Sequence, residues 1–237
     1  GDYGTLSSDS SAHSIVDTRK VGNLVLHLSS GPFEVGDMVH GELDWARRRQ
    51  LMDHHTSVHI VGGAARKLLG PHIYQAGANK SVESARLDIT HHRRLTRTDL
   101  DEIESMSNEI IQQVQRTEKT TLNRRDADRK YGFDLYQGGA PKGSDIRILR
   151  IAEHDIQACG GTHHDEPGRI GQIRVIRSNA VQDGVERLHI VAGQAAMEHA
   201  RKQENLLRMS AETFQVPIDE LPVTASRFFS EWKEQRK

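Results

Sequence analysis

Cysteine is almost absent from this chain of 237 residues, which contains one Cys, and aromatic residues make up only 5% of it. A single Cys excludes a disulfide framework and suits a reducing compartment, so we expect a cytoplasmic location. The low aromatic content argues against a stacking surface for single-stranded nucleic acid. No apolar stretch reaches the roughly 20 residues of a membrane helix, and no signal-peptide pattern is present, so we expect no membrane partner.

An excess of positive charge is also missing, because 32 Lys and Arg face 33 Asp and Glu. The net charge of -1 argues against the basic field of a DNA-binding protein, and we expect no DNA partner. The first residue is Gly1 rather than Met, so we expect a fragment or a processed chain. Histidine, in contrast, is abundant: the chain has 14 His beside its one Cys, which directs attention to metal binding.

The hydrophobic pattern predicts an α+β fold in three parts. Residues 1–45 are typical of short strands, residues 46–200 of one mixed domain with an antiparallel sheet, and residues 201–237 of a helical tail. In the first part we expect strands at 21–28 and 38–45. In the second we expect strands around 86–90, 146–151, 173–175 and 188–190, and an irregular connection over 123–143.

Three helical segments are predicted. A long helix over 47–69 should end at Gly70-Pro71, and the Gly62-Gly63 pair inside it costs about 1 kcal/mol per Gly relative to Ala. We therefore expect a neighbouring segment to approach its backbone there. A second helix should begin at Thr98, with Asp101 completing a capping box. The tail should be helical from 194, with breaks at Pro217 and Pro222.

Two short motifs indicate a metal site. His55 and His59 are four residues apart on the predicted helix, so their imidazoles lie one turn apart on the same side. Cys159 and His163 have the same separation, with two glycines between them. Three imidazoles and one thiolate suit tetrahedral Zn²⁺ better than Mg²⁺ or Ca²⁺. One His pair at this spacing arises easily by chance among so many histidines, but the only Cys in a second such motif favours one zinc ion bound by all four.

Together these motifs resemble a known family. His55-Thr-Ser-Val-His59, followed by Ala158-Cys-Gly-Gly-Thr-His163, is similar to the editing domain of alanyl-tRNA synthetases of the archaeal type. The segments 36–48, 69–77, 86–91, 168–171 and 184–188 also fit, so the resemblance covers roughly residues 15–200. It implies a small β-barrel-like subdomain at 1–45, a zinc-dependent editing domain at 46–200, and at 201–237 the start of a helical oligomerisation region. The family's aminoacylation domain has no counterpart in the chain.

The resemblance implies hydrolysis of tRNA for alanine that wrongly carries Ser or Gly. An alanine pocket cannot exclude the smaller Gly and discriminates weakly against Ser, so a second, hydrolytic site is needed. The zinc ion either activates a water or, with four protein ligands, shapes the pocket. The partner would be the acceptor end of this tRNA, with basic clusters at 47–49 and 124–130 as candidate phosphate contacts, or else as ordinary solvated faces.

Eight further residues are candidates for the site, each with an ordinary structural alternative. Gln75 matches a family position near the editing pocket, Thr56 could bind the seryl hydroxyl, and the N–H groups of Gly160 and Gly161 could contact an oxyanion. Asp88 and His91 could transfer protons, and Arg187 could bind a phosphate or adenine. Thr162 completes the Cys motif as a substrate contact.

Two other functions stay open at this point. A threonyl-tRNA synthetase editing domain shares the framework of four ligands, although Cys-Gly-Gly-Thr-His favours alanine. A non-catalytic, zinc-stabilised RNA-binding module would use the same ligands and the basic clusters without turnover. The absence of Glu after the first His excludes the HExxH arrangement of metalloproteases.

Overall fold

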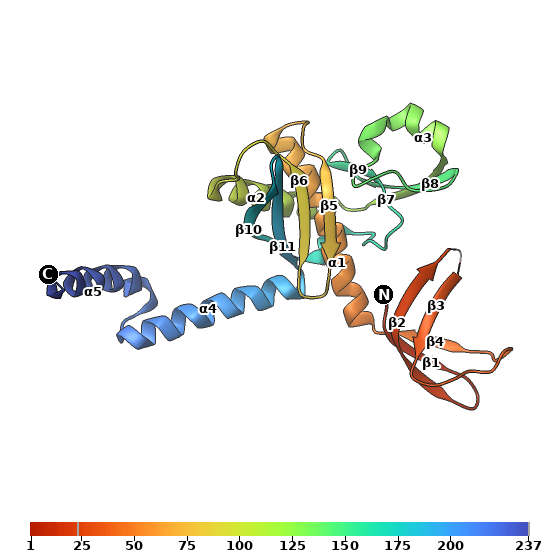
Figure 1. Ribbon diagram of the computed structural model, residues 1–237, viewed down its shortest axis with the longest axis horizontal. Coiled ribbons are helices and arrows are strands. Elements are labelled where there is room, and N and C mark those ends of the chain that lie inside the picture. The colour runs from red at the N-terminus through yellow and green to blue at the C-terminus, as the bar shows by residue number, and fades with distance from the viewer. Residues whose placement is uncertain (23, 237) are drawn as a thin grey trace. The chain divides into compact units, whose positions relative to one another are not determined.

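The computed structural model describes residues 1–22 and 24–236 (Figure 1). Its contacts divide the chain into two compact units, Gly1–Gly193 and the residues from Gln194 onward. The first unit is α+β, as predicted, with three antiparallel sheets. No helix in the described part of the chain is long and apolar enough to cross a membrane.

The N-terminal sheet has the order β3-β2-β1-β4, with β1 at Gly4–Ser7, β2 at Ala12–Val21, β3 at Leu24–Ser29 and β4 at His40–Leu43. Among the described residues β3 and β4 are its two free edges, so the expected barrel-like closure is wrong. Four strands are too few to close around a filled interior. The strand predicted over 21–28 is confirmed from Leu24 onward as β3, but it begins later than expected because the chain turns at Gly22, whose φ is +62°, and Val21 ends β2; Asn23 lies outside the described residues.

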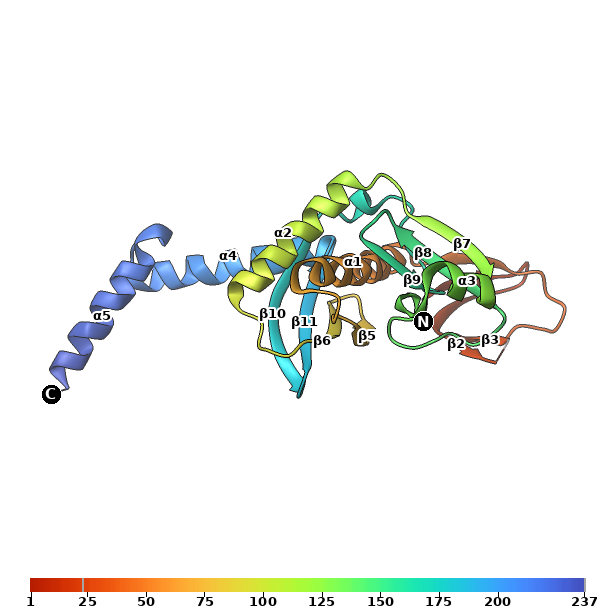
Figure 2. The same ribbon diagram turned by 90° about the horizontal axis from the view of Figure 1, so that it is seen from above.

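The central layer holds the main core. Its sheet has the order β10-β11-β6-β5, and α1 and α2 pack against each other and against this sheet (Figure 2). Ile60, Ile103 and Leu188 are fully buried between them. These elements are α1 at Trp45–Leu69, β5 at Gln75–Lys80, β6 at Ala85–Thr90, α2 at Arg97–Gln113, β10 at Ile173–Gln182 and β11 at Val185–Ala192.

Helix α1 confirms the expectation of a close backbone approach, at one of its two glycines. A Cβ at Gly63 would overlap the carbonyl oxygen of His154, whereas one at Gly62 would make an ordinary 3.6 Å contact with Leu87. The helix ends before Gly70, whose φ is +118°. The segment around His154 is therefore fixed against the middle of α1.

Helix α2 begins two residues earlier than predicted. Thr96 is its N-cap, and Asp99 completes the capping box: the Asp99 N–H donates to the Thr96 hydroxyl, and the Thr96 N–H donates to the Asp99 carboxylate. Thr98 and Asp101 show the same spacing in the sequence. Arg93, which binds the Asp99 carboxylate at 2.7 and 2.8 Å, adds support at the earlier position.

A third sheet of order β7-β8-β9 carries half of the candidate site. It consists of β7 at Glu118–Asn123, β8 at Asp145–Ile151 and β9 at Asp155–Ala158. The connection over 123–143 is not irregular throughout, because it contains α3 at Arg124–Tyr131 and the 3₁₀ helix η1 at Phe133–Leu135. Only Ala127 of α3 is buried, so the helix has no apolar repeat that the sequence could reveal. A further 3₁₀ helix, η2, spans Pro167–Ile170.

The second unit is helical, as predicted, with α4 at Gln194–Phe214, η3 at Ile218–Glu220 and α5 at Leu221–Gln235. The rings of Phe214 and Phe228 meet edge to face at 5.5 Å between centroids. Pro217 does separate the two long helices, but Pro222 lies in the first turn of α5 and breaks nothing. Proline is compatible with a first turn because its missing N–H would have no partner there.

Candidate metal centre

Helix α1 supplies two of the four predicted ligands. His55 and His59 are one turn apart, with ring centroids separated by 5.5 Å. His59 is buried, and its Nδ1 lies 2.9 Å from a carboxylate oxygen of the buried Asp155 at the start of β9. This bond leaves Nε2 of His59 as the nitrogen that is free to face a metal.

The loop after β9 supplies the other two ligands. The sulfur of Cys159 lies 3.2 Å from Nε2 of His163 and 3.5 Å from Nε2 of His55. One ligand atom from each of the four residues falls within 4.8 Å of all the others. The fold thus brings together the two motifs, which are about a hundred residues apart in the sequence.

These distances fit a tetrahedral zinc ion. A sulfur ligand at about 2.3 Å and nitrogen ligands at about 2.0–2.1 Å lie about 3.6 Å from each other around such an ion. The measured separations of 3.2 and 3.5 Å need only a small expansion of the cluster. The donor set of three imidazoles and one thiolate is also one that favours zinc over hard cations.

Buried partners hold the ligands and their neighbours. The Asp155 carboxylate that orients His59 accepts a second hydrogen bond from Gln157, at 2.8 Å. The Thr56 hydroxyl is fully buried, lies 3.4 Å from Nδ1 of His163, and accepts the N–H of His164 at 3.3 Å. Thr56 therefore contacts the loop directly.

Position 161 requires glycine for a steric reason that the sequence alone did not reveal. A Cβ at this position would overlap the imidazole ring of His55. Around Gly160, in contrast, there is open space, and both Gly160 and Thr162 are exposed. The loop thus approaches α1 at one glycine and faces outward at the other.

Arg147 on β8 is a residue that the sequence analysis missed. Its guanidinium donates to the carbonyl oxygens of Cys159 and Gly161, and its own carbonyl accepts the N–H of Cys159. These bonds fix the backbone between the two loop ligands. A single Arg within a strand carries no signal for this role, because its partners are backbone atoms of another segment.

The cluster favours an ionised sulfur. Burial raises the pKa of the Cys159 thiol, but hydrogen bonds with His163, His55 and His59 outweigh it and hold this pKa well below its usual range. Burial also lowers the pKa of His163, to about 3, and that of His55. For His59 the effect of burial is outweighed by the bond to Asp155 and by Cys159, which raise its pKa to about 9.

The other predicted site residues lie outside the four-residue cluster. Asp88 and Arg187 face each other across β6 and β11 and form a two-pronged ion pair at 2.6 and 2.8 Å. The Gln75 side chain lies against Gly138, and the backbone N–H of Gln75 donates to the side-chain oxygen of Gln137 at 2.9 Å. His91 is buried, with its Nδ1 2.8 Å from Nε2 of His72. Their contacts with a substrate stay predictions.

The basic clusters have partners of their own within the chain. Arg47 stacks over the ring of Tyr3, and Arg48 pairs with Asp2. Arg124 donates to the carbonyl oxygens of Pro141 and Gly143 and thereby holds the loop after η1. Arg125, Arg129 and Lys130 remain exposed on α3.

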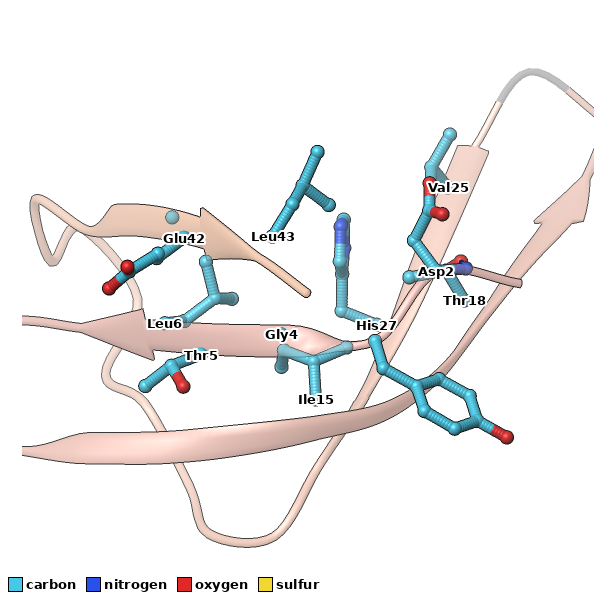
Figure 3. Close-up of a pocket in the computed structure, with 12 residues that line it drawn as sticks. Asp2, Gly4, Thr5, Leu6, Ile15, Thr18, Val25, His27, Glu42 and Leu43 are labelled. Carbon is cyan, nitrogen blue, oxygen red and sulfur yellow. Dashed lines mark hydrogen bonds between the residues drawn. The ribbon is translucent and has the colours of Figure 1, made fainter. Parts of the chain in front are cut away.

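The N-terminal sheet contains a separate hollow (Figure 3). Leu6, Ile15, Val25, His27 and Leu43 are among the residues that line it. Its lining includes none of the residues predicted for the site. The cluster of metal ligands is therefore the better candidate for chemistry.

Comparison with known proteins agrees with this geometry. The family described as "Threonyl and Alanyl tRNA synthetase second additional domain" matches residues 146–189, which carry Cys159, His163 and Arg147. The whole chain also aligns with alanine–tRNA ligases. It is 44% identical to that of Pyrococcus furiosus over 238 residues, 45% to that of Halobacterium salinarum over 236, and 48% to that of Methanospirillum hungatei over 239. Along its whole length the chain is homologous to the alanine–tRNA ligases.

The alignments confirm the resemblance that the two motifs indicated. The chain spans about a quarter of the length of these ligases, between 25% and 26% of each. The candidate metal ligands thus lie in a chain that aligns with a segment of these ligases, and Cys159 and His163 fall within the part that matches the family described for threonyl- and alanyl-tRNA synthetases.

Proposed function

We propose that this chain is a hydrolytic editing module, which releases Ser or Gly from wrongly charged tRNA for alanine. The observation that carries the proposal is the cluster of His55, His59, Cys159 and His163 in a segment homologous to alanine–tRNA ligases. A ligase for alanine needs such a site, because differences of one hydroxyl or one methyl group change binding by only about 1–3 kcal/mol.

One zinc ion per chain is part of this proposal. When bound, zinc supplies a fixed positive charge beside the reacting ester. Four protein ligands match a closed coordination shell, so we propose that its main role is to join α1 to the loop at 159–163. Asp155 and Thr56 then act as positioning residues for His59 and His163, which they contact directly.

The exposed part of the loop is the proposed place for the ester. Hydrolysis adds water to the carbonyl carbon and breaks its bond to the ribose oxygen, giving the free amino acid and tRNA. The outward-facing Gly160 and Thr162 leave room beside the loop backbone, and the N–H groups of Gly160 and Gly161 are proposed to stabilise the oxyanion. Gln75 is proposed to orient the amino acid or the attacking water.

The acceptor end of tRNA would be the partner. We propose that Arg125, Arg129 and Lys130 bind its phosphates, since these cations are exposed along α3. Arg124 and Arg48 instead hold the protein together through Pro141 and Asp2. Arg187, which pairs with Asp88, stays a proposed contact for a phosphate or the terminal adenine. We also propose that the helices of the second unit contribute to a homo-oligomer in a longer protein, because Leu206, Leu207, Phe229 and Trp232 expose apolar surface.

A deacylation panel tests the reaction. The zinc-loaded chain is incubated with seryl-, glycyl- and alanyl-tRNA for alanine and with seryl-tRNA for threonine, and its zinc content is measured on the same sample. We expect release of Ser or Gly from the tRNA for alanine and sparing of alanyl-tRNA. Preference for the tRNA for threonine would instead support editing of the threonyl type. Tight tRNA binding without any release would support the non-catalytic RNA-binding module.

Gln75→Ala tests the role of Gln75 in the same assay. We expect a lower rate of release with unchanged zinc content, because Gln75 is not one of the four ligands. Gln113→Ala, at an exposed position near the end of α2, is the matched control and should change neither. Equal rates for Gln75→Ala and the parent chain would remove Gln75 from the site.

A further inference from the structure

A second group of histidines lies outside the centre described above. His72 follows α1, and His91 and His92 follow β6 directly. One ring nitrogen from each lies within 4.8 Å of the others. The ring centroids are 5.1, 5.3 and 4.7 Å apart, close to the 5.5, 4.1 and 4.8 Å among the three imidazoles of the first centre.

Hydrogen bonds of the backbone and of the Thr90 hydroxyl hold the segment at His72 against the end of β6. These bonds do not involve the imidazoles. The Thr90 hydroxyl donates to the carbonyl of His72 at 2.5 Å and accepts the N–H of Tyr74 at 2.8 Å. The N–H of His91 donates to the carbonyl of Gly184 at 2.9 Å. The histidines are thus held near one another by elements that do not depend on a bound ion, as a preorganised site requires.

The imidazole of His91 has an unsatisfied nitrogen. Its Nδ1 lies 2.8 Å from Nε2 of His72, while its Nε2 is buried without a hydrogen-bond partner in the described part of the chain. A buried polar atom left unpaired costs about 1–3 kcal/mol. Each neutral imidazole carries one N–H and one lone pair, so in the contact between His72 and His91 one ring donates its N–H and the other accepts it. In the tautomer in which His91 donates from Nδ1, its buried Nε2 carries a lone pair that a metal ion can accept.

The surroundings of His91 favour its neutral form. Burial, followed by the neighbouring His92, His72 and Arg93, lowers its pKa below the usual value. The nearby cations are themselves engaged: Arg93 binds Asp99, and Arg94 lies 3.5 Å from Glu186. A neutral imidazole offers a lone pair, and this is the form in which histidine binds metals.

We propose that His72, His91 and His92 form a second metal site, for a borderline divalent cation such as Zn²⁺, Co²⁺ or Ni²⁺. Three imidazoles leave at least one coordination position open, and His72 and His92 are exposed, so this position faces solvent. The bound ion links the loop after α1 to the end of β6. Since Gln75 is only three residues beyond His72, the same link fixes the start of β5.

Metal titration of the full chain tests the second site without any tRNA. Metal-free protein is titrated with Co²⁺, and the visible spectrum and the bound metal are measured together. The first centre contains a thiolate and gives a sulfur-to-cobalt charge-transfer band, whereas the second contains only nitrogen ligands and gives none. We expect a second equivalent of Co²⁺ to bind after the charge-transfer band has reached its maximum.

Three variants assign that second equivalent. His92→Ala changes an exposed side chain and should abolish it while keeping the charge-transfer band. His40→Ala, an exposed histidine on β4, is the matched control and should bind as the parent chain does. Cys159→Ser should lose the band and keep the second site. Binding of only one equivalent by the parent chain, or of two by His92→Ala, would overturn the proposal.

Discussion

His55 and His59 are held by the backbone of a buried helix, whereas Cys159 and His163 lie on a loop that side chains from elsewhere hold in place. The helical half needs only the i, i+4 spacing to align its ligands. The loop half depends on Arg147, on Thr56 and on the absence of a side chain at Gly161. Half of this metal centre is therefore encoded locally, and half by contacts between distant parts of the chain.

The largest effect should come from removing a ligand of the loop half. Cys159→Ala takes away the thiolate, and we expect a loss of zinc affinity greater than about 100-fold, together with loss of deacylation. Native mass spectrometry and the seryl-tRNA assay measure the two losses. Full zinc content in Cys159→Ala would show that this residue is not a ligand.

Gly63→Ala tests how closely the helical half is packed. The new methyl group would overlap the carbonyl of His154, so we expect a loss of about 1–3 kcal/mol in the free energy of unfolding. Gly62→Ala is the matched control: its Cβ makes an ordinary contact, and it should gain up to about 1 kcal/mol from helix propensity. Urea denaturation measures the change in the free energy of unfolding for each variant. A change of the same sign in both variants would contradict the close contact at Gly63.

Arg147→Ala should loosen the loop half and leave the helix intact. We expect zinc affinity to fall by about 10-fold or more, because a support of the ligands is lost while the ligands themselves remain. Arg150→Ala, on the same strand, removes an arginine that pairs with Glu118 and Glu153 instead and should leave zinc affinity unchanged. Competition with a chromophoric chelator measures the difference.

The smallest effect concerns the cap of α2, which packs against α1. Arg93, followed by Thr96, lowers the pKa of Asp99 below that of a free carboxyl group. Deprotonated Asp99 therefore stabilises the fold above the unfolded pKa of about 4, and this stabilisation is lost as the pH falls through the lower folded pKa. Asp99→Asn should cost about 1 kcal/mol near neutral pH and less in acid.

Asp101→Asn is the control when the free energy of unfolding of Asp99→Asn is measured at neutral and at acid pH. It also tests where the helix begins. Asp101 pairs with the exposed Arg97 on the helix surface, at 2.5 Å. We expect a change of a few tenths of a kcal/mol with little dependence on pH. A larger loss for Asp101→Asn than for Asp99→Asn would restore the cap that the sequence pattern first indicated.

The sequence predicted those parts of the fold whose cause is local. The long helix, its end at Gly70 and the strands β6, β8, β10 and β11 follow from periodicity and from turn residues, and the structure confirms them. It did not predict α3, because one buried Ala leaves no apolar repeat, nor did it predict β1, β2, β5, β7 and β9. In the site, the spacing of Cys159 and His163 could be read directly, but Asp155 and Arg147 could not, since their partners are distant in the chain.

Gly63, His59 and His55 meet the segment 154–159 in reverse order along the chain: Gly63 at His154, His59 at Asp155 and His55 at Cys159. The eight steps from His55 to Gly63 rise about 12 Å along the helix, and the five steps from His154 to Cys159 span at most about 17 Å, so the two segments run alongside each other in opposite directions. Asp155 begins β9 and Cys159 directly follows it, so an insertion or deletion of one residue between them would reverse the alternation of side chains along the strand and move Cys159 away from His55. The length of this segment, and not only the identity of its residues, therefore keeps the carboxylate of Asp155 and the thiol of Cys159 aligned with their two histidines.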